Sequence, residues 1–134
     1  MDNWEGFLTQ SRRFWEVAEA INDPEHSNQA VSNAIHAVIA ANDALCLRLM
    51  RRRPGGTSHA EGARALQQAC KGTPWEREAA TRARQYSQIV KEKNAAEYEG
   101  QPIGPEIAER IMTQSSRFRD WAQSVLAKSG GPRA

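Results

Sequence analysis

The chain has 134 residues, a formal net charge of +2 and an apolar content of 40%. This length suits one domain, and the apolar content is that of a globular chain rather than a disordered one. The net charge is too small to predict nucleic-acid binding by itself, so any such surface must be a local patch. Cys46 and Cys70 have no metal-ligand spacing to a histidine, so we expect no disulfide framework, no metal site and no cofactor.

A membrane segment is not expected in this chain. No apolar run approaches the ~20 residues that a membrane-spanning helix requires. The N-terminus carries no basic stretch followed by an apolar one, so no signal peptide is predicted. We therefore expect a cytoplasmic protein with no membrane partner.

Two helices are predicted in the first half of the chain. The first runs from about residue 2 to 21, with a stripe of helical period formed by Trp4, Leu8, Ser11, Trp15 and Ala18. Pro24 ends this segment because proline disfavours helix at the residue before it. The second runs from about residue 27 to 53 and is rich in alanine, a strong helix former. Its stripe has heptad-like spacing and comprises Val31, Ile35, Val38, Asn42, Leu45 and Leu49.

Three further helices are predicted in the second half. A capping box of Ser58 and Glu61 begins a short third helix, which Gly72 closes. The fourth helix begins near Pro74 and runs to about Tyr98. The fifth begins near residue 105, and its inward residues are Ile107, Ile111, Ser115, Phe118, Ala122 and Val125. Residues 129–134 are expected to form a disordered tail.

These segments predict an all-α fold. No stretch alternates with the period of two residues that a strand shows, and no β-hairpin signal occurs. We expect an antiparallel four-helix bundle with one additional short helix, in a single domain of residues 1–128.

The end of the fourth helix is the first candidate for a functional site. Tyr86, Val90, Lys93 and Glu97 fall at helical spacings, so the apolar stripe continues into a lysine and a carboxylate. Charged residues on the buried face of a helix destabilise the fold unless they are paired or take part in function. Two interpretations stay open. One is an ion pair on the helix face, and the other is a cleft in which Lys93 and Asn94 contact a phosphate or a partner.

The second helix carries further candidates. His36 and Asp43 lie seven residues apart on one face, with small residues around them. They are either satisfied core groups or side chains that point toward Lys93 across the bundle. A basic patch at the end of this helix is either a solvated terminus or a surface that tracks phosphates. It comprises Arg48, Arg51, Arg52 and Arg53.

Three features occur in a characteristic order. They are the alanine-rich segment from Ser32 to Cys46, the Gly-rich turn that leads into Ser58-His59-Ala60-Glu61, and the helix that ends in Lys93-Asn94-Ala95-Ala96-Glu97-Tyr98. This order resembles the HEPN domain (higher eukaryotes and prokaryotes nucleotide-binding), over about residues 5–127, and is closest to its small stand-alone bacterial members. The resemblance implies a helical bundle that usually dimerises, with motif residues lining a cleft at the dimer interface.

The resemblance also implies an activity and a partner. Active members of this family are metal-independent ribonucleases whose motif is an arginine, a polar residue and, after four to six positions, a histidine. Many are toxins paired with a small nucleotidyltransferase. In this sequence Lys93 stands in place of the arginine, Asn94 matches the polar residue, and Glu97 and Tyr98 stand where the histidine is expected.

We therefore interpret the chain as a HEPN-like homodimeric binding or regulatory module for RNA or nucleotide that has lost ribonuclease activity. Acid–base cleavage near neutral pH calls for the missing histidine. The alternative is a metal-independent ribonuclease toxin with a nucleotidyltransferase antitoxin. The catalytic candidates are Lys93, Asn94, Glu97, Tyr98 and His36. The ligand-binding candidates are Lys93, Asn94, Asp43, Arg51, Arg52 and Arg53.

Overall fold

The structure, a computed structural model, describes residues 3–54, 58–97, 100 and 102–129. Every regular element in this part of the chain is a helix, which confirms the all-α prediction. The elements are, in order, α1 (Trp4–Ala20), the short 3-10 helix η1 (Pro24–His26), α2 (Ser27–Met50), α3 (His59–Cys70), α4 (Glu76–Val90), α5 (Lys93–Glu97) and α6 (Pro105–Ser129).

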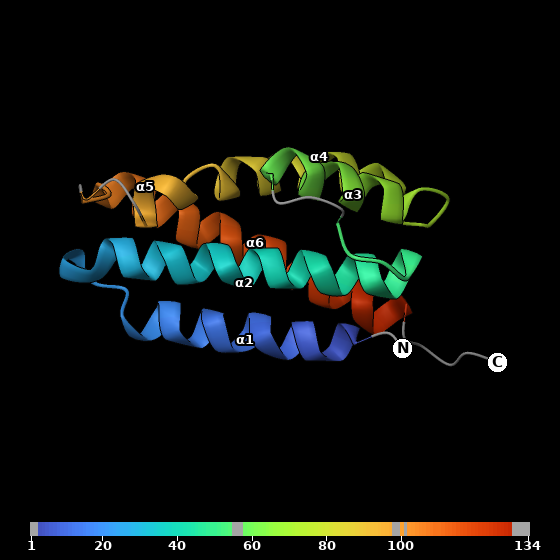
Figure 1. Cartoon of the computed structure of the whole chain (residues 1–134), viewed down its shortest axis with the longest axis horizontal. Coiled ribbons are helices and arrows are strands. Elements are labelled where there is room, and N and C mark those ends of the chain that lie inside the picture. The colour runs from blue at the N-terminus through green and yellow to red at the C-terminus, as the bar shows by residue number, and fades with distance from the viewer. Residues whose placement is uncertain (1–2, 55–57, 98–99, 101, 130–134) are drawn as a thin grey trace.

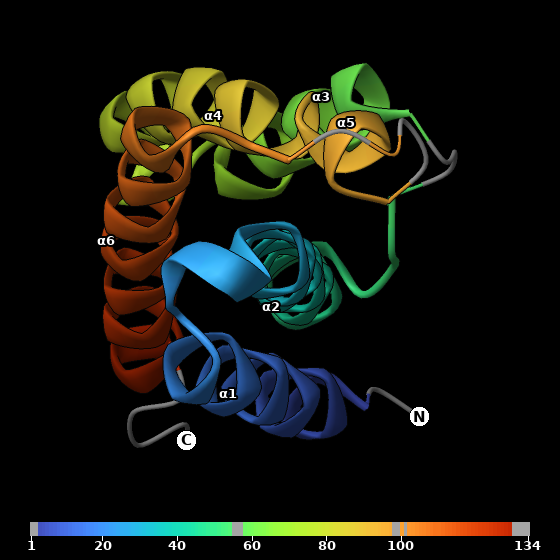
Figure 2. The same cartoon turned by 90° about the vertical axis from the view of Figure 1, so that its left-hand side faces the viewer.

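Helix α2 is the centre of the molecule. Figure 1 and Figure 2 show α1 along one side of it, a layer of α3, α4 and α5 on the opposite side, and α6 along a third side. Neighbours cover most of its circumference, so side chains on several of its faces are buried. Small alanine side chains allow these neighbours to approach closely. The fully buried residues of α2 include Ala30, Val31, Ala34, Ile35, Ala37, Val38, Asn42, Ala44, Leu45 and Cys46.

This central helix corrects one expectation from the sequence. Residues 24–50 form a single stretch that is long and apolar enough to span a membrane by length and composition alone, although no such stretch was expected. In its most apolar window, 72% of the residues are buried inside the protein. The apolar composition of α2 is therefore matched by the helices that enclose it.

Side chains define the predicted helix boundaries. Asp23 accepts hydrogen bonds from the backbone N–H groups of Glu25 and His26 and so begins η1, one turn after α1 has ended. Ser58 Oγ accepts a bond of 3.2 Å from the N–H of Glu61 and begins α3, as the capping box predicts. The Ser58 cap confirms the break predicted before residue 59, whereas the break predicted before residue 27 is confirmed by the end of α1 at Ala20, and α2 itself begins without a side-chain cap.

The predicted fourth helix is in fact two helices. Helix α4 ends at Val90, and α5 begins at Lys93. Between them the N–H of Glu92 bonds to the carbonyl of Ile89, three residues back, which tightens the chain into a turn. The prediction of one continuous helix to residue 98 was wrong, because period and propensity do not reveal this turn. Its consequence is that α5 is a separate element that packs against α2.

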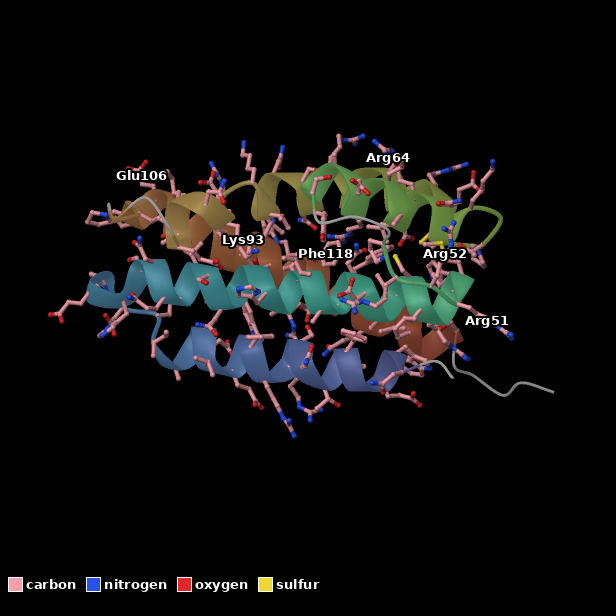
Figure 3. All side chains as sticks on the ribbon, viewed as in Figure 1. Arg51, Arg52, Arg64, Lys93, Glu106 and Phe118 are labelled. Atoms are coloured by element: carbon pink, nitrogen blue, oxygen red, sulfur yellow. The ribbon has the colours of Figure 1, made fainter. Side chains whose placement is uncertain are left out.

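The inner face of α6 is shifted slightly from the predicted stripe. Ile107 is 39% exposed, so its assignment to the core was wrong, and the neighbouring Ala108 is buried in its place. The rest of the predicted stripe is confirmed, with Phe118 fully buried between Tyr86 and Trp121. Figure 3 shows Phe118 in the middle of the molecule, between α2 and the layer of α3 and α4.

A buried polar contact connects three helices. Ser11 on α1 is fully buried, and its Oγ donates to the carbonyl of Ala37 on α2 at 2.7 Å. The same oxygen accepts a bond of 3.0 Å from Nε of Arg119 on α6. Arg119 also lies over the Trp15 ring, 5.6 Å from its centroid. Burial lowers the pKa of Arg119, because a guanidinium charge is costly away from water.

The two cysteines are free thiols inside the fold. Cys46 on α2 and Cys70 at the end of α3 are both buried. Burial raises the pKa of Cys46 to about 12 and that of Cys70 to about 11, so both remain protonated at neutral pH. As the sequence predicted, they serve as small apolar residues.

Candidate functional site

A cleft opens between α2 and the layer of α3, α4 and α5. Its volume is about 260 Å³. Figure 3 shows Lys93 in this region, between α2 and the layer opposite α1. The lining residues are His36, Ile39, Asp43, Arg53, Pro54, Ser58, Gly62, Tyr86, Val90 and Lys93. Four of the residues singled out from the sequence therefore meet here: His36, Asp43, Arg53 and Lys93.

One end of the cleft holds a histidine–carboxylate pair. His36 Nε2 on α2 lies 3.0 Å from Glu97 Oε2 on α5, and Ser32 Oγ donates to the same oxygen at 2.9 Å. An ionised carboxylate only accepts hydrogen bonds, so the proton of this pair belongs on His36 Nε2. In the neutral imidazole, Nδ1 is then the acceptor of the ring. The Phe14 ring stacks on the His36 ring with centroids 5.3 Å apart and fixes its plane.

The surroundings of Glu97 favour its charged form. Burial acts to raise its pKa, but the Ser32 hydroxyl, His36 and Lys93 together outweigh burial, so the pKa of Glu97 lies below its usual value. A carboxylate with a depressed pKa stabilises the fold above its unfolded pKa, and that stabilisation is lost as the pH falls through its folded pKa.

We expect Glu97→Gln to lower the melting temperature at pH 7 and to cost progressively less as the pH falls below about 4, near the unfolded pKa of glutamate. The measurement is a series of thermal unfolding curves between pH 3 and 7 for both proteins. Glu109→Gln, on the exposed surface of α6, is the matched control. A constant difference between Glu97→Gln and wild type across this range would contradict the assigned role of the pair.

The other end of the cleft holds a second ion pair. Arg53 Nη2 donates to Asp43 Oδ2 at 3.1 Å, and its guanidinium lies over the Phe7 ring at 4.5 Å from the centroid. The Asp43 side chain is only 10% exposed, whereas that of Arg53 is 57% exposed. Burial raises the pKa of Asp43, and the nearby Arg53 charge only partly offsets that rise. Arg53 can therefore reach solvent and a ligand while it covers a buried carboxylate.

The floor of the cleft is made by close packing of α3 on α4. A Cβ atom on Gly62 would come within 2.5 Å of the Tyr86 hydroxyl, so only glycine fits here. Asn42, fully buried on α2, donates from Nδ2 to the Gly62 carbonyl at 3.1 Å. Glycine thus lets α3 approach close enough to close the cleft on that side.

Not every predicted site residue belongs to this cleft. Asn94 is exposed and does not line it, so its expected place beside Lys93 in the cleft is not observed. His36 meets Glu97 rather than Asn94. The close partners of Glu97 are Ser32 and His36, so the expected ion pair with Lys93 on one helix face is not observed. Tyr98 lies outside the described residues.

The four arginines of the predicted basic patch lie in four different places. Arg48 donates to the carbonyl of Ser129 at 2.7 Å and lies over Trp4, so it anchors the end of α6. Arg51 caps α2 in a left-handed conformation, with φ of 62°, and Figure 3 shows it at the far end of that helix. Arg52 lines a smaller neighbouring cavity, and Arg53 enters the cleft.

Several residues that contact the cleft residues carried no clear signal in the sequence. Phe7 and Phe14 on α1 lie against the Arg53 guanidinium and the His36 ring, and their spacing of seven residues matches that of His36 and Asp43 on α2. This shared spacing is the one signal that could have identified them. Ser32 lies four residues before His36, so the two side chains share a helix face.

No group of three or more His, Cys, Asp or Glu side chains within the described ranges is placed to hold a metal ion. Comparisons with protein-family models, with curated proteins and with solved structures give no match for this chain.

Proposed function

We propose that the chain is a HEPN-like binding or regulatory module that holds a phosphate-bearing ligand, RNA or nucleotide, in the cleft beside α2. The observation that carries this proposal is the convergence of His36 on α2, Arg53 just beyond the end of α2 and Lys93 on α5 on one cavity. Lysine and arginine bind phosphate oxygens through charge-assisted hydrogen bonds. The apolar residues Ile39 and Val90 give the same cavity a wall that suits a base or a sugar.

The proposed architecture is an antiparallel four-helix bundle of α1, α2, α4 with α5, and α6, with α3 as the additional short helix. In support, Figure 1 shows α1 and α4 running in one direction and α2 and α6 in the other. We also propose a cytoplasmic homodimer, with a nucleotidyltransferase as a candidate partner. Val17 and Ile107 are exposed large apolar residues that a two-fold dimer could bury. A monomer mass by light scattering at micromolar concentration would contradict the dimer.

We expect Lys93→Ala to weaken binding of a labelled RNA or nucleotide about tenfold, since a hydrogen bond to a charged group contributes roughly 1.5 kcal/mol. The melting temperature should change little, because Lys93 is only half-buried at the cleft wall. Fluorescence anisotropy measures the affinity, and Lys91→Ala is the matched control, because Lys91 is exposed two residues away and does not line the cleft. Equal losses of affinity in both variants would show that the cleft is not the binding site.

A second candidate function is metal-independent cleavage of RNA, and one observation favours it. The His36–Glu97 pair supplies the imidazole that the sequence motif lacks. In such cleavage a base takes the 2′-hydroxyl proton, the 2′-oxygen attacks phosphorus, and an acid protonates the leaving 5′-oxygen. His36 could serve through Nδ1, with Glu97 orienting the ring.

We nevertheless expect no detectable cleavage by the wild-type protein. Nε2 of His36 is already bound to Glu97, the Asp43 carboxyl is bound to Arg53, and Lys93 lacks the bidentate fork of arginine. The test incubates the protein with single-stranded and structured RNA in EDTA and separates the products on a gel. Cleavage that is lost in His36→Ala and kept in His26→Ala, a change on the exposed η1, would establish the ribonuclease.

A further inference from the structure

A second cavity adjoins the cleft at Arg53. This smaller cavity has a volume of about 120 Å³ and shares Arg53 and Pro54 with the cleft. It lies over the C-terminal part of α2 and the adjacent face of α3. Its remaining lining residues are Met50, Arg52, Glu61, Arg64, Ala65 and Gln68. Arg53 and Pro54 therefore lie where the two cavities adjoin, and the two cavities together are called the groove below.

The groove differs in charge from the other cavities. It is lined by four cations, Lys93, Arg52, Arg53 and Arg64, and by two carboxylates, Asp43 and Glu61. The three cavities along α6 have balanced or negative linings. Their charged residues are Glu19 with Arg117; Glu106 and Glu109 with Arg110 and Arg117; and Asp23 with Glu109. Among these cavities, only the groove has an excess of positive charge.

The length of the groove exceeds one phosphate group. Its lining on α2 extends from His36 to Met50, a rise of about 21 Å at roughly 1.5 Å per residue. Successive phosphates of one stacked strand lie only about 3.4 Å apart along its axis. Figure 3 shows Lys93 and Arg52 on the side of α2 that faces the α3–α5 layer, and Arg64 on α3. Lys93 thus lines the cleft, Arg52 and Arg64 line the smaller cavity, and Arg53 lines both.

We propose that Arg52 and Arg64 form a second phosphate subsite, and that the ligand is a single nucleic-acid strand with several phosphates rather than a mononucleotide. This inference rests on the proposed function of the cleft. Lys93 and His36 contact one phosphodiester, Arg53 lies at the junction, and Arg52 and Arg64 contact a later one. The arginines are exposed at the rim, where they neutralise phosphates without reading bases.

The experiment compares an eight-nucleotide single strand with a mononucleotide by fluorescence anisotropy and competition. We expect Arg64→Ala to weaken strand binding about fivefold, to reduce the salt dependence of that binding by about one phosphate contact, and to leave mononucleotide binding unchanged. Arg84→Ala, an exposed arginine on α4 away from the groove, is the matched control and should bind the strand like wild type. Length dependence with both RNA and DNA would identify the shared phosphodiester backbone as the ligand, whereas dependence with RNA alone would identify RNA.

The outcomes separate this inference from the proposed function. If the wild type binds both ligands equally and Arg64→Ala binds like wild type, the second subsite is wrong while the cleft remains a phosphate site. If Arg64→Ala weakens the binding of both ligands equally, the groove is one site and the inference also fails. If neither ligand binds the wild type, the proposed function fails first.

Discussion

Replacing Ser11 with alanine is expected to lower the free energy of unfolding by about 2–3 kcal/mol. The substitution removes the hydroxyl that bonds to Ala37 on α2 and to Arg119 on α6. Loss of that oxygen leaves Nε of a buried guanidinium without its acceptor, and an unpaired buried donor is more costly than the bond itself is stabilising. Thermal unfolding should show a fall in melting temperature of roughly 6–15 °C.

Ser115 provides the matched control for Ser11. It is also fully buried, on α6, but its Oγ has no hydrogen-bond partner among the described residues. Ser115→Ala should therefore leave the melting temperature unchanged or raise it, because it removes a buried polar atom that has no partner. Similar losses in the two variants would show that the Ser11 contact is not what stabilises the packing of α1, α2 and α6.

Gly62→Ala is expected to destabilise the protein by about 1–3 kcal/mol, the usual cost of overpacking a tight interface. The new Cβ would lie 2.5 Å from the Tyr86 hydroxyl and 2.7 Å from its ring. Tyr86 cannot easily move, because its ring packs against Phe118 in the core. Chemical denaturation measures the change, and RNA or nucleotide affinity should fall with it, since both residues line the cleft.

Two further variants test this explanation of Gly62. Gly104→Ala places a methyl group where no atom beyond its chain neighbours lies within 4 Å, so it should cost less than Gly62→Ala. Tyr86→Phe removes the nearest clashing atom and should recover part of the loss when combined with Gly62→Ala, which a double-mutant cycle detects. Additive effects in that cycle would mean that the cost of Gly62→Ala arises elsewhere than at Tyr86.

The helices themselves were predictable because their signals are local. The break at Pro24, the cap at Ser58 and the apolar period of α2 depend on residues a few positions apart. The turn after Val90 was missed because it depends on how α5 docks onto α2 through distant residues. Ile107 was wrongly predicted to be buried, because the apolar stripe of α6 does not show how far the helices packed against it extend.

The candidate site was only partly predictable from the sequence. Lys93 stood out because a charge interrupts an apolar stripe, and His36 and Asp43 because they share a face of α2. The sequence gives no means to pair His36 with Glu97, which lies 61 residues away. Nor does it show that the Arg53 side chain lies apart from Arg51 and Arg52 and covers Asp43.

The short helix α5 is expected to unfold locally while the rest of the protein stays folded. Five residues are too few to hold a helix by backbone bonds alone. Its order must come from side chains of α2: Ser32 and His36 hold Glu97, and Asn28 Nδ2 donates to the Ala96 carbonyl at 3.5 Å. Amide hydrogens of α5 should therefore exchange with solvent through local opening, far faster than those of α2. Because Lys93 begins this helix, slowed exchange at α5 would report ligand binding without any label on the ligand.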